Sequence, residues 1–379
     1  MERRVTPLEL FFDLVFVFAL TQVTTMLGED ATWHGLSRSL LVLGALWWAW
    51  AGYAWLTNTI DADEDVVVAA LIVAMGAMFV AALVVPTAFT SHAVLFGAAF
   101  LLVNLMHVAL YALAARGDPD LLTGVLHMAR SALVGASLIL VAGFVSDDLR
   151  PWLWLIALVI GLFGPLLIDL GAWRLQPAHF VERHGLVIII ALGESLIAVG
   201  VGARATSVSA AVIVASLLGL AIATSFWIAY FDFFAVRFQR LLTETRGVAQ
   251  IALARDAYTY LHLPMVAGIV LTAVAMRKAV AHVGADLHTI PALALCGGSA
   301  LYVGSYLGIR WRVSRTLRSG RLVATLVFVA LFPVALVTPA IVALALVAAT
   351  WVALHAYEFI WWREARSETR GLRDAASSP

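Results

Sequence analysis

Acidic and amide side chains interrupt an apolar stretch near the start of the chain. Thr6 to Gln22 has the sequence TPLELFFDLVFVFALTQ, with Glu9 and Asp13 four residues apart. Residues at that spacing share one face of an α-helix, so the two carboxylates would point the same way. Carboxylates inside apolar segments of membrane-spanning length are costly unless they have a partner or a function. This stretch is therefore the first candidate for chemistry.

A related pattern returns in mid-chain, where Val181 to Ser195 has the sequence VERHGLVIIIALGES. Glu194 lies twelve residues beyond Glu182, which is about 18 Å along a helix that rises ~1.5 Å per residue. That distance predicts a carboxyl group near the middle of a membrane, where it could carry a proton. The alternative is a protonated carboxyl group that is hydrogen-bonded to a neighbouring helix.

Histidine and cysteine residues do not form a recognisable metal or catalytic motif. HExxH and CxxC patterns are absent, and Cys296 is the single cysteine. A zinc site needs three or four converging ligands. We therefore expect neither a metal nor another cofactor, and an enzyme is the less favoured class of protein.

The composition indicates a membrane protein. Of the 379 residues, 63% are hydrophobic and only 13% are charged, whereas a soluble domain is about half apolar and a quarter charged. Lys plus Arg and Asp plus Glu are equal at 24 each. Because no net charge would attract it, nucleic acid is not an expected partner.

The apolar runs predict an all-α, polytopic membrane helix bundle with about twelve transmembrane helices. Each run is close to the length of roughly 20 residues that a bilayer requires. The predicted spans are 7–27, 36–58, 66–86, 92–115, 122–145, 151–173, 182–203, 207–233, 254–276, 289–310, 320–337 and 339–362.

Basic residues predict the orientation of these spans. With the N-terminus inside, seventeen basic residues fall in cytoplasmic segments and five in exterior segments. Cytoplasmic loops of membrane proteins carry an excess of Lys and Arg. The asymmetry therefore predicts that both termini lie inside and that the number of crossings is even.

Acidic and basic residues also gather where the predicted helices meet the cytoplasm. An unpaired charge at that depth is costly, so we expect ion pairs from Arg130 and Arg255 to Glu9, Asp13, Asp169 or Asp232. This layer would either fix helix packing or gate a substrate path. The candidate charge network or gate comprises Glu9, Asp13, Arg130, Asp169, Glu182, Arg183, His184, Asp232, Arg255 and Asp256.

An internal repeat is suggested by similar residues at offsets that grow along the chain. The offsets rise from 172 to 191 residues, and the matched pairs are Leu14 and Leu186, Trp48 and Trp227, Asp65 and Asp256, and Arg130 and Arg321. Two parallel six-helix repeats, 1–175 and 176–362, would be related by an axis along the membrane normal and followed by a polar cytoplasmic tail, 363–379. The alternative is chance similarity between helices that are rich in Leu, Val and Ala.

The repeat would make Gln22 the partner of Glu194, so that the two side chains face one another across the axis. Transporters commonly bind their substrate at such a repeat interface. His262, one turn after Tyr258, is a further polar residue within a predicted span. We therefore name Glu194, Gln22 and His262 as the candidate residues for substrate or proton binding.

Four segments together carry a resemblance to a known family. TPLELFFDLVFVFAL, WWAWAGYAWLTN, HFVERHGLVIIIALGESLIAVG and RDAYTYLHLPMVAGI resemble the bacterial low temperature requirement protein A (LtrA) family. The resemblance covers nearly the whole chain and implies a polytopic inner-membrane protein associated with growth at low temperature. It supplies no substrate and no catalytic residue. The matching positions are Glu9, Asp13, Glu182, His184, Gly193, Glu194, Arg255, Asp256 and His262.

These observations favour a transporter-like protein for a small solute or ion, coupled to protons through Glu194. One alternative is an ion channel whose pore is lined by the first and seventh helices, with bulky residues such as Phe16 and Ile188 as a hydrophobic gate. Another is a membrane enzyme or sensor that acts on a lipid-like ligand. The expected location is the bacterial cytoplasmic (inner) membrane, and the expected partners are the lipid bilayer and the solute, with a homo-oligomer left open.

Overall fold

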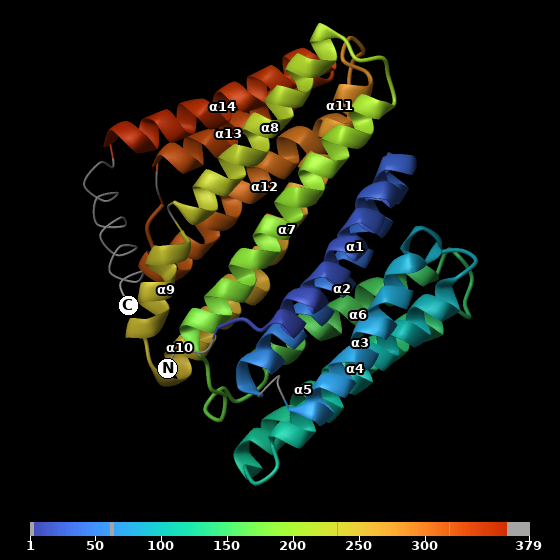
Figure 1. Cartoon of the computed structure of the whole chain (residues 1–379), viewed down its shortest axis with the longest axis vertical. Coiled ribbons are helices and arrows are strands. Elements are labelled where there is room, and N and C mark those ends of the chain that lie inside the picture. Colours follow the sequence, from blue (N-terminus) through green and yellow to red (C-terminus); the bar gives the residue numbers. More distant parts are fainter. Residues whose placement is uncertain (1–3, 61–63, 233, 318, 362–379) are drawn as a thin grey trace. The chain divides into compact units, whose positions relative to one another are not determined.

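The computed structural model describes residues 4–60, 64–232, 234–317 and 319–361, which form helices and no β-strand (Figure 1). The all-α prediction is therefore confirmed for these residues, and the predicted tail 363–379 lies outside them. The first helices are α1 (Pro7–Glu29), α2 (Trp33–Thr59), α3 (Asp65–Leu83), α4 (Ala93–Ala114), α5 (Pro119–Ala142), α6 (Arg150–Phe163) and α7 (Pro177–Arg204). They are followed by α8 (Ala210–Phe231), α9 (Ala235–Glu244), α10 (Gly247–Ala254), α11 (His262–Ala281), α12 (Thr289–Ser314), α13 (Ser319–Ala335) and α14 (Ala340–Trp361).

Within the described ranges, ten helical segments are long and apolar enough to cross a membrane. Two shorter apolar segments, Arg150–Leu166 and Ser319–Ala335, correspond to the predicted spans 151–173 and 320–337. The first of these is shorter than predicted because α6 gives way to a 3-10 turn, η2 (Gly164–Leu166). Pro165 in that turn has no amide hydrogen to continue the helix, and it restricts the residue before it.

The segment after α8 contains a short helix that the sequence analysis did not predict. In α9, Phe238 and Leu242 are buried, whereas Arg240 and Glu244 are exposed and form an ion pair at 2.7 Å. Apolar residues on one face and charges on the other are typical of a helix that lies at a membrane surface. With ten residues, α9 is too short to give a membrane-spanning signal.

The predicted span 254–276 is part of a longer helical run. It extends from Gly247 to Ala281 and consists of α10, the π-helical segment η3 (Arg255–Tyr260) and α11. A π-helical turn contains an extra residue and is frequently found at functional sites. Here it changes which side chains face the neighbouring helices just before His262.

The chain divides into two compact units, and along α7 the boundary falls between Arg183 and His184. In the first unit, α3 packs against α1 and α4, and α5 packs against α4 and α6. Arg150 connects the start of α6 to the end of α5, since its Nε and Nη2 donate to the carbonyls of Ala142 and Val145 at 2.9 and 3.1 Å. These bonds satisfy carbonyls that the end of a helix leaves free.

In the second unit, α11 packs against α8, α12 and α14. Helix α13 packs against α12, which precedes it in the chain, and against α14, which follows it. Backbones approach closely where Gly268 of α11 faces Gly298 of α12: a Cβ atom on Gly268 would lie 2.6 Å from the Gly298 carbonyl oxygen. Small residues allow such close packing between membrane helices. The repeat boundary at residues 175/176 stays a prediction.

Candidate functional site

The start of α1 fixes the position of Glu9. Thr6 caps the helix: its Oγ1 accepts a hydrogen bond from the Glu9 amide at 3.3 Å, and Glu9 Oε2 accepts one from the Thr6 amide at 2.8 Å. This reciprocal arrangement satisfies two amides that the first turn leaves free. Asp13 follows one turn later, and both acidic residues are buried.

The start of α7 supplies the partners of these carboxylates. Nη1 of Arg183 lies 3.0 Å from Glu9 Oε1, and Nη2 lies 2.6 Å from Asp13 Oδ1. His179, four residues before Arg183, places Nε2 3.1 Å from Glu9. All four side chains are at most 1% exposed and belong to the first unit. Glu9, Asp13, His179 and Arg183 are called the buried charge cluster below.

Helix α2 contributes two uncharged hydrogen-bonding side chains to the buried charge cluster. Trp50 Nε1 donates to Asp13 Oδ1 at 2.8 Å, and Arg183 Nη1 donates to Thr57 Oγ1 at 3.2 Å. Hydrogen bonds that involve an ionised group are stronger than neutral ones. The two bonds therefore orient the Asp13 carboxylate and the Arg183 guanidinium.

The hydrogen-bond network assigns the tautomer of His179. Asn58 Oδ1 accepts from the Gln176 amide at 2.8 Å, so Asn58 Nδ2 is the atom that lies 3.1 Å from His179 Nδ1. An amide NH₂ group can only donate, and His179 Nδ1 must therefore accept. The ring proton then resides on Nε2 and is donated to Glu9 Oε2 at 3.1 Å. His179 is neutral in this arrangement.

The charges of the buried charge cluster do not balance. Two carboxylates and one guanidinium leave one excess negative charge when His179 is neutral. Within the described part of the chain, Asp13 Oδ2 is buried and has no hydrogen-bond partner. A buried charge without compensation is costly. A proton or a small monovalent cation at Asp13 Oδ2 would neutralise the cluster.

A second polar cluster surrounds His262 in the second unit. His262 Nδ1 lies 2.9 Å from the Ala257 carbonyl, so this nitrogen carries the proton, and Nε2 accepts from the Tyr230 hydroxyl at 3.0 Å. The His262 ring lies 4.5 Å from that of Tyr258 and 5.5 Å from that of His184, centroid to centroid. The π-helical segment provides both Ala257 and Tyr258. Both nitrogens of His262 thus have partners, and its role in substrate binding stays a prediction.

The ion pairs of the candidate charge network differ from those predicted. Glu9 and Asp13 pair with Arg183, a member of the predicted network. Arg130 is exposed. Arg255 donates to its neighbour Asp256 at 2.8 Å. Grouping residues by depth did not indicate Arg183 as the partner of Glu9 and Asp13, because pairing also depends on which helix faces meet. Pairs of Arg130 or Arg255 with Asp169 or Asp232 stay a prediction.

The remaining network residues occupy separate places. Glu182 is exposed and accepts from the Val5 amide at 3.3 Å. Asp169 is also exposed and accepts from the Gly171 amide at 2.9 Å, in the non-helical segment that follows η2. Asp232 is the C-terminal cap of α8. The structure therefore brings only Glu9, Asp13 and Arg183 of the predicted network into the buried charge cluster.

Glu194 and Gln22 lie in different units. Glu194 is 2% exposed on the part of α7 that belongs to the second unit, and Gln22 is half-buried on α1 in the first. Their apposition across a repeat axis stays a prediction.

Sequence reasoning missed His179, Trp50 and Asn58. The signal that could have found His179 is its spacing, because it precedes Arg183 by one helical turn on the same face of α7. Trp50 and Asn58 gave no local signal, since their partners are 37 and 121 residues away in sequence.

The fold and the buried charge cluster define a class: a multi-pass helical membrane protein with ionisable groups in its first and seventh helices. In the described part of the chain, no group of three or more His, Cys, Asp or Glu side chains could hold a metal ion.

The sequence profile of the bacterial low temperature requirement A protein (LtrA) matches residues 4–356, so the chain belongs to the LtrA family.

A relative is similar in sequence over most of its length. The chain is 31% identical over 325 residues to an uncharacterized protein of Rhizobium meliloti, an alignment that covers 82% of this chain and 78% of the relative. No solved structure matches the chain significantly.

Proposed function

We propose that the chain is a proton-coupled, transporter-like protein for a small solute or ion in the bacterial inner membrane. The observation that carries the proposal is the charge balance of the buried charge cluster. Its two carboxylates share one guanidinium, and a neutral His179 donates to Glu9. Such a cluster is neutral only when it holds one additional proton or cation, which is what a coupling site must bind and release.

The architecture of the proposed transporter has twelve crossings in two parallel six-helix repeats, with both termini inside. The division into two compact units and the excess of basic residues in the expected cytoplasmic segments support it. The two short segments, Arg150–Leu166 and Ser319–Ala335, have 17 residues each. At ~1.5 Å per residue they measure about 26 Å, close to the roughly 30 Å of a hydrocarbon core. We include both of them as crossings.

The solute in this proposal binds near the middle of the membrane. Glu194, Gln22 and His262 are the proposed binding groups, and Asp13 holds the coupled proton. Glu194 is nearly fully buried, and buried ionisable groups in membrane helices commonly mark substrate or proton pathways. In this scheme Arg183 is a fixed counter-ion that keeps Glu9 charged, and Asp13 is the group that gains and loses the proton.

The test uses the full chain in liposomes that contain a pH-sensitive dye. An inward pH gradient is imposed, and small cations, anions, sugars and amino acids are added one at a time. Transport is supported if one solute accelerates proton movement and the rate saturates as the concentration of that solute rises. Unitary currents in planar bilayers would show a channel instead. Asp13→Asn and Glu194→Gln should abolish the solute-dependent movement.

The matched control is Arg240→Gln on α9, which removes a charge at an exposed position outside the proposed pathway. This variant should transport as the unaltered chain does. Unchanged proton movement in both Asp13→Asn and Glu194→Gln would contradict the proposal.

A further inference from the structure

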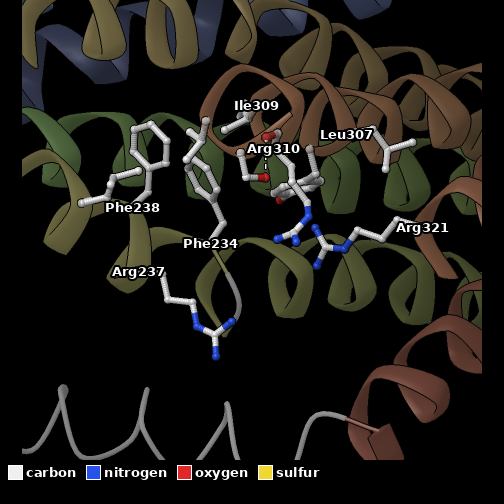
Figure 2. A pocket seen from close by; sticks show the side chains of 11 residues that line it. Phe234, Arg237, Phe238, Leu307, Ile309, Arg310 and Arg321 are labelled. Atoms are coloured by element: carbon white, nitrogen blue, oxygen red, sulfur yellow. Dashed lines mark hydrogen bonds between the residues drawn. The ribbon is translucent and has the colours of Figure 1, made fainter. Parts of the chain in front are cut away.

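A pocket of about 210 Å³ lies in the second unit, among α9, α12, α13 and the residue that precedes α9 (Figure 2). Much of its lining is apolar, with Phe234, Phe238, Leu307 and Ile309 among the lining residues. A pocket of this volume is large enough for a small polar head group.

Three arginines from three helices also line this pocket. They are Arg237 of α9, Arg310 of α12 and Arg321 of α13, and none of the described lining residues is acidic. Figure 2 shows the guanidinium groups of Arg310 and Arg321 pointing toward one another. Like charges at close range repel, and the ion pair between Arg321 and Glu358 offsets part of this repulsion.

The hydrogen bonds of the arginines distinguish their roles. Arg321 Nε donates to Glu358 Oε1 at 2.7 Å, and the guanidinium lies over the Tyr306 ring at 4.5 Å from its centroid. Arg321 is thus held in place by residues of the protein itself. Arg310 Nε, in contrast, is buried and has no hydrogen-bond partner in the described part of the chain. A buried donor without a partner costs free energy, so a ligand that supplies an acceptor to this nitrogen would bind favourably.

We propose that this pocket binds a phosphate group that is carried on an apolar body. Guanidinium groups match phosphate oxygens in geometry and donate two parallel hydrogen bonds to them. The apolar lining can accommodate the carbon atoms that are attached to the phosphate. The group can come from a membrane phospholipid or from a soluble phosphate ester, and both present the same chemistry to the arginines.

The location of the pocket favours the phospholipid. The amphipathic helix α9 supplies Phe238 and Arg237 to the pocket and has Arg240 and Glu244 on its exposed side. Helices of this kind lie in the membrane–water interface, where head groups are found. Basic pockets between transmembrane helices on the cytoplasmic side are a known mode of head-group binding. This inference is independent of the proposed transport, because the pocket shares no residue with the buried charge cluster.

The experiment measures binding to the purified full chain in a neutral detergent. Phosphatidic acid is compared with diacylglycerol, which has the same apolar body without the phosphate, and with glycerol phosphate, which has the phosphate without the apolar body. Native mass spectrometry gives the bound fraction at each concentration. We expect saturable binding of phosphatidic acid and much weaker binding of diacylglycerol.

Variants connect the binding to the pocket. Arg310→Gln should weaken binding of phosphatidic acid on the order of tenfold, the usual effect of losing a hydrogen bond to a charged group. Arg310→Lys should keep part of the affinity, because a lysine still presents a point charge. Arg240→Gln is the matched control, because it also replaces an arginine by glutamine but at a position on α9 outside the pocket. The affinity of this variant for phosphatidic acid should not change.

The outcomes distinguish a phospholipid from a soluble phosphate ester, and both of these from a pocket that binds no phosphate. Equal affinity for glycerol phosphate and phosphatidic acid would support a phosphate site for a soluble ester and would overturn the contribution of the apolar body. Equal affinity for diacylglycerol and phosphatidic acid would overturn the proposal, as would equal affinities of Arg310→Gln and Arg240→Gln for phosphatidic acid. If Arg310→Gln does not fold, the affinities of Arg237→Gln and Arg310→Lys for phosphatidic acid are compared with that of Arg240→Gln, and equal affinities would overturn the proposal.

Discussion

Arg183 is the single fixed positive charge of the buried charge cluster, and its removal should be strongly destabilising. Arg183→Gln leaves Glu9 and Asp13 buried, each without the guanidinium that lies at 3.0 and 2.6 Å in the structure. Breaking one buried pair by removing a partner costs about 3–5 kcal/mol. Because two carboxylates lose the same partner here, we expect the free energy of unfolding to fall by an amount near the upper end of this range, about 5 kcal/mol at neutral pH.

The cost of Arg183→Gln should depend on pH in a defined direction. Acidic conditions protonate the two carboxyl groups, and a neutral carboxyl group needs no counter-ion. The difference in stability between Arg183→Gln and the unaltered chain should therefore be largest at neutral pH and should shrink as the pH falls. A difference that grows on acidification would contradict the assignment of Glu9 and Asp13 as the charges that Arg183 compensates.

The assay is denaturant unfolding of the purified full chain in mild detergent, followed by tryptophan fluorescence. The triple variant Glu9→Gln/Asp13→Asn/Arg183→Gln should recover most of the loss, because neutral groups replace a pair that was costly to desolvate. Arg240→Gln provides the comparison: its pair with Glu244 is 60% exposed on both sides, and such pairs contribute about 0–1 kcal/mol. The reasoning is refuted if Arg183→Gln costs no more than Arg240→Gln.

Three further substitutions test other parts of the structure by the same unfolding measurement. Trp50→Phe removes the donor to Asp13 together with the five-membered ring of the indole, so it should cost at least roughly 1–3 kcal/mol. Arg321→Met leaves Glu358 buried at 2% exposure without its ion pair and should cost about 3–5 kcal/mol. Gly268→Val forces a side chain against the backbone of α12 and should cost at least about 1–3 kcal/mol. A substitution that leaves stability unchanged would show that the corresponding contact is not formed.

Composition and the lengths of the apolar runs were enough to predict the helical membrane architecture. Ten of the predicted spans correspond to helices of sufficient length, because twenty consecutive apolar residues leave few alternatives to a spanning helix. The other two correspond to the shorter segments Arg150–Leu166 and Ser319–Ala335, and Pro165 ends the first of them early. Helix α9 was not predicted because it is too short and too polar to be recognised as a separate helix.

The partners within the candidate site were harder to predict than its members. The sequence indicated Glu9, Asp13 and Arg183 because charged residues are rare in apolar helices. It could not indicate that Trp50 donates to Asp13, or that Asn58 sets the tautomer of His179. Those contacts depend on how α2 packs against α1 and the start of α7. Side-chain partners that are distant in sequence follow from packing and not from local spacing.

The central claim is that Asp13 in the buried charge cluster binds and releases a proton, and infrared spectroscopy can observe this directly. Difference spectra of the full chain in lipid membranes, recorded as the pH is lowered stepwise, should show the carbonyl band of a protonated buried carboxyl group. The band should be absent in Asp13→Asn and present in Arg240→Gln. A carbonyl band of unchanged intensity in Asp13→Asn would contradict the account.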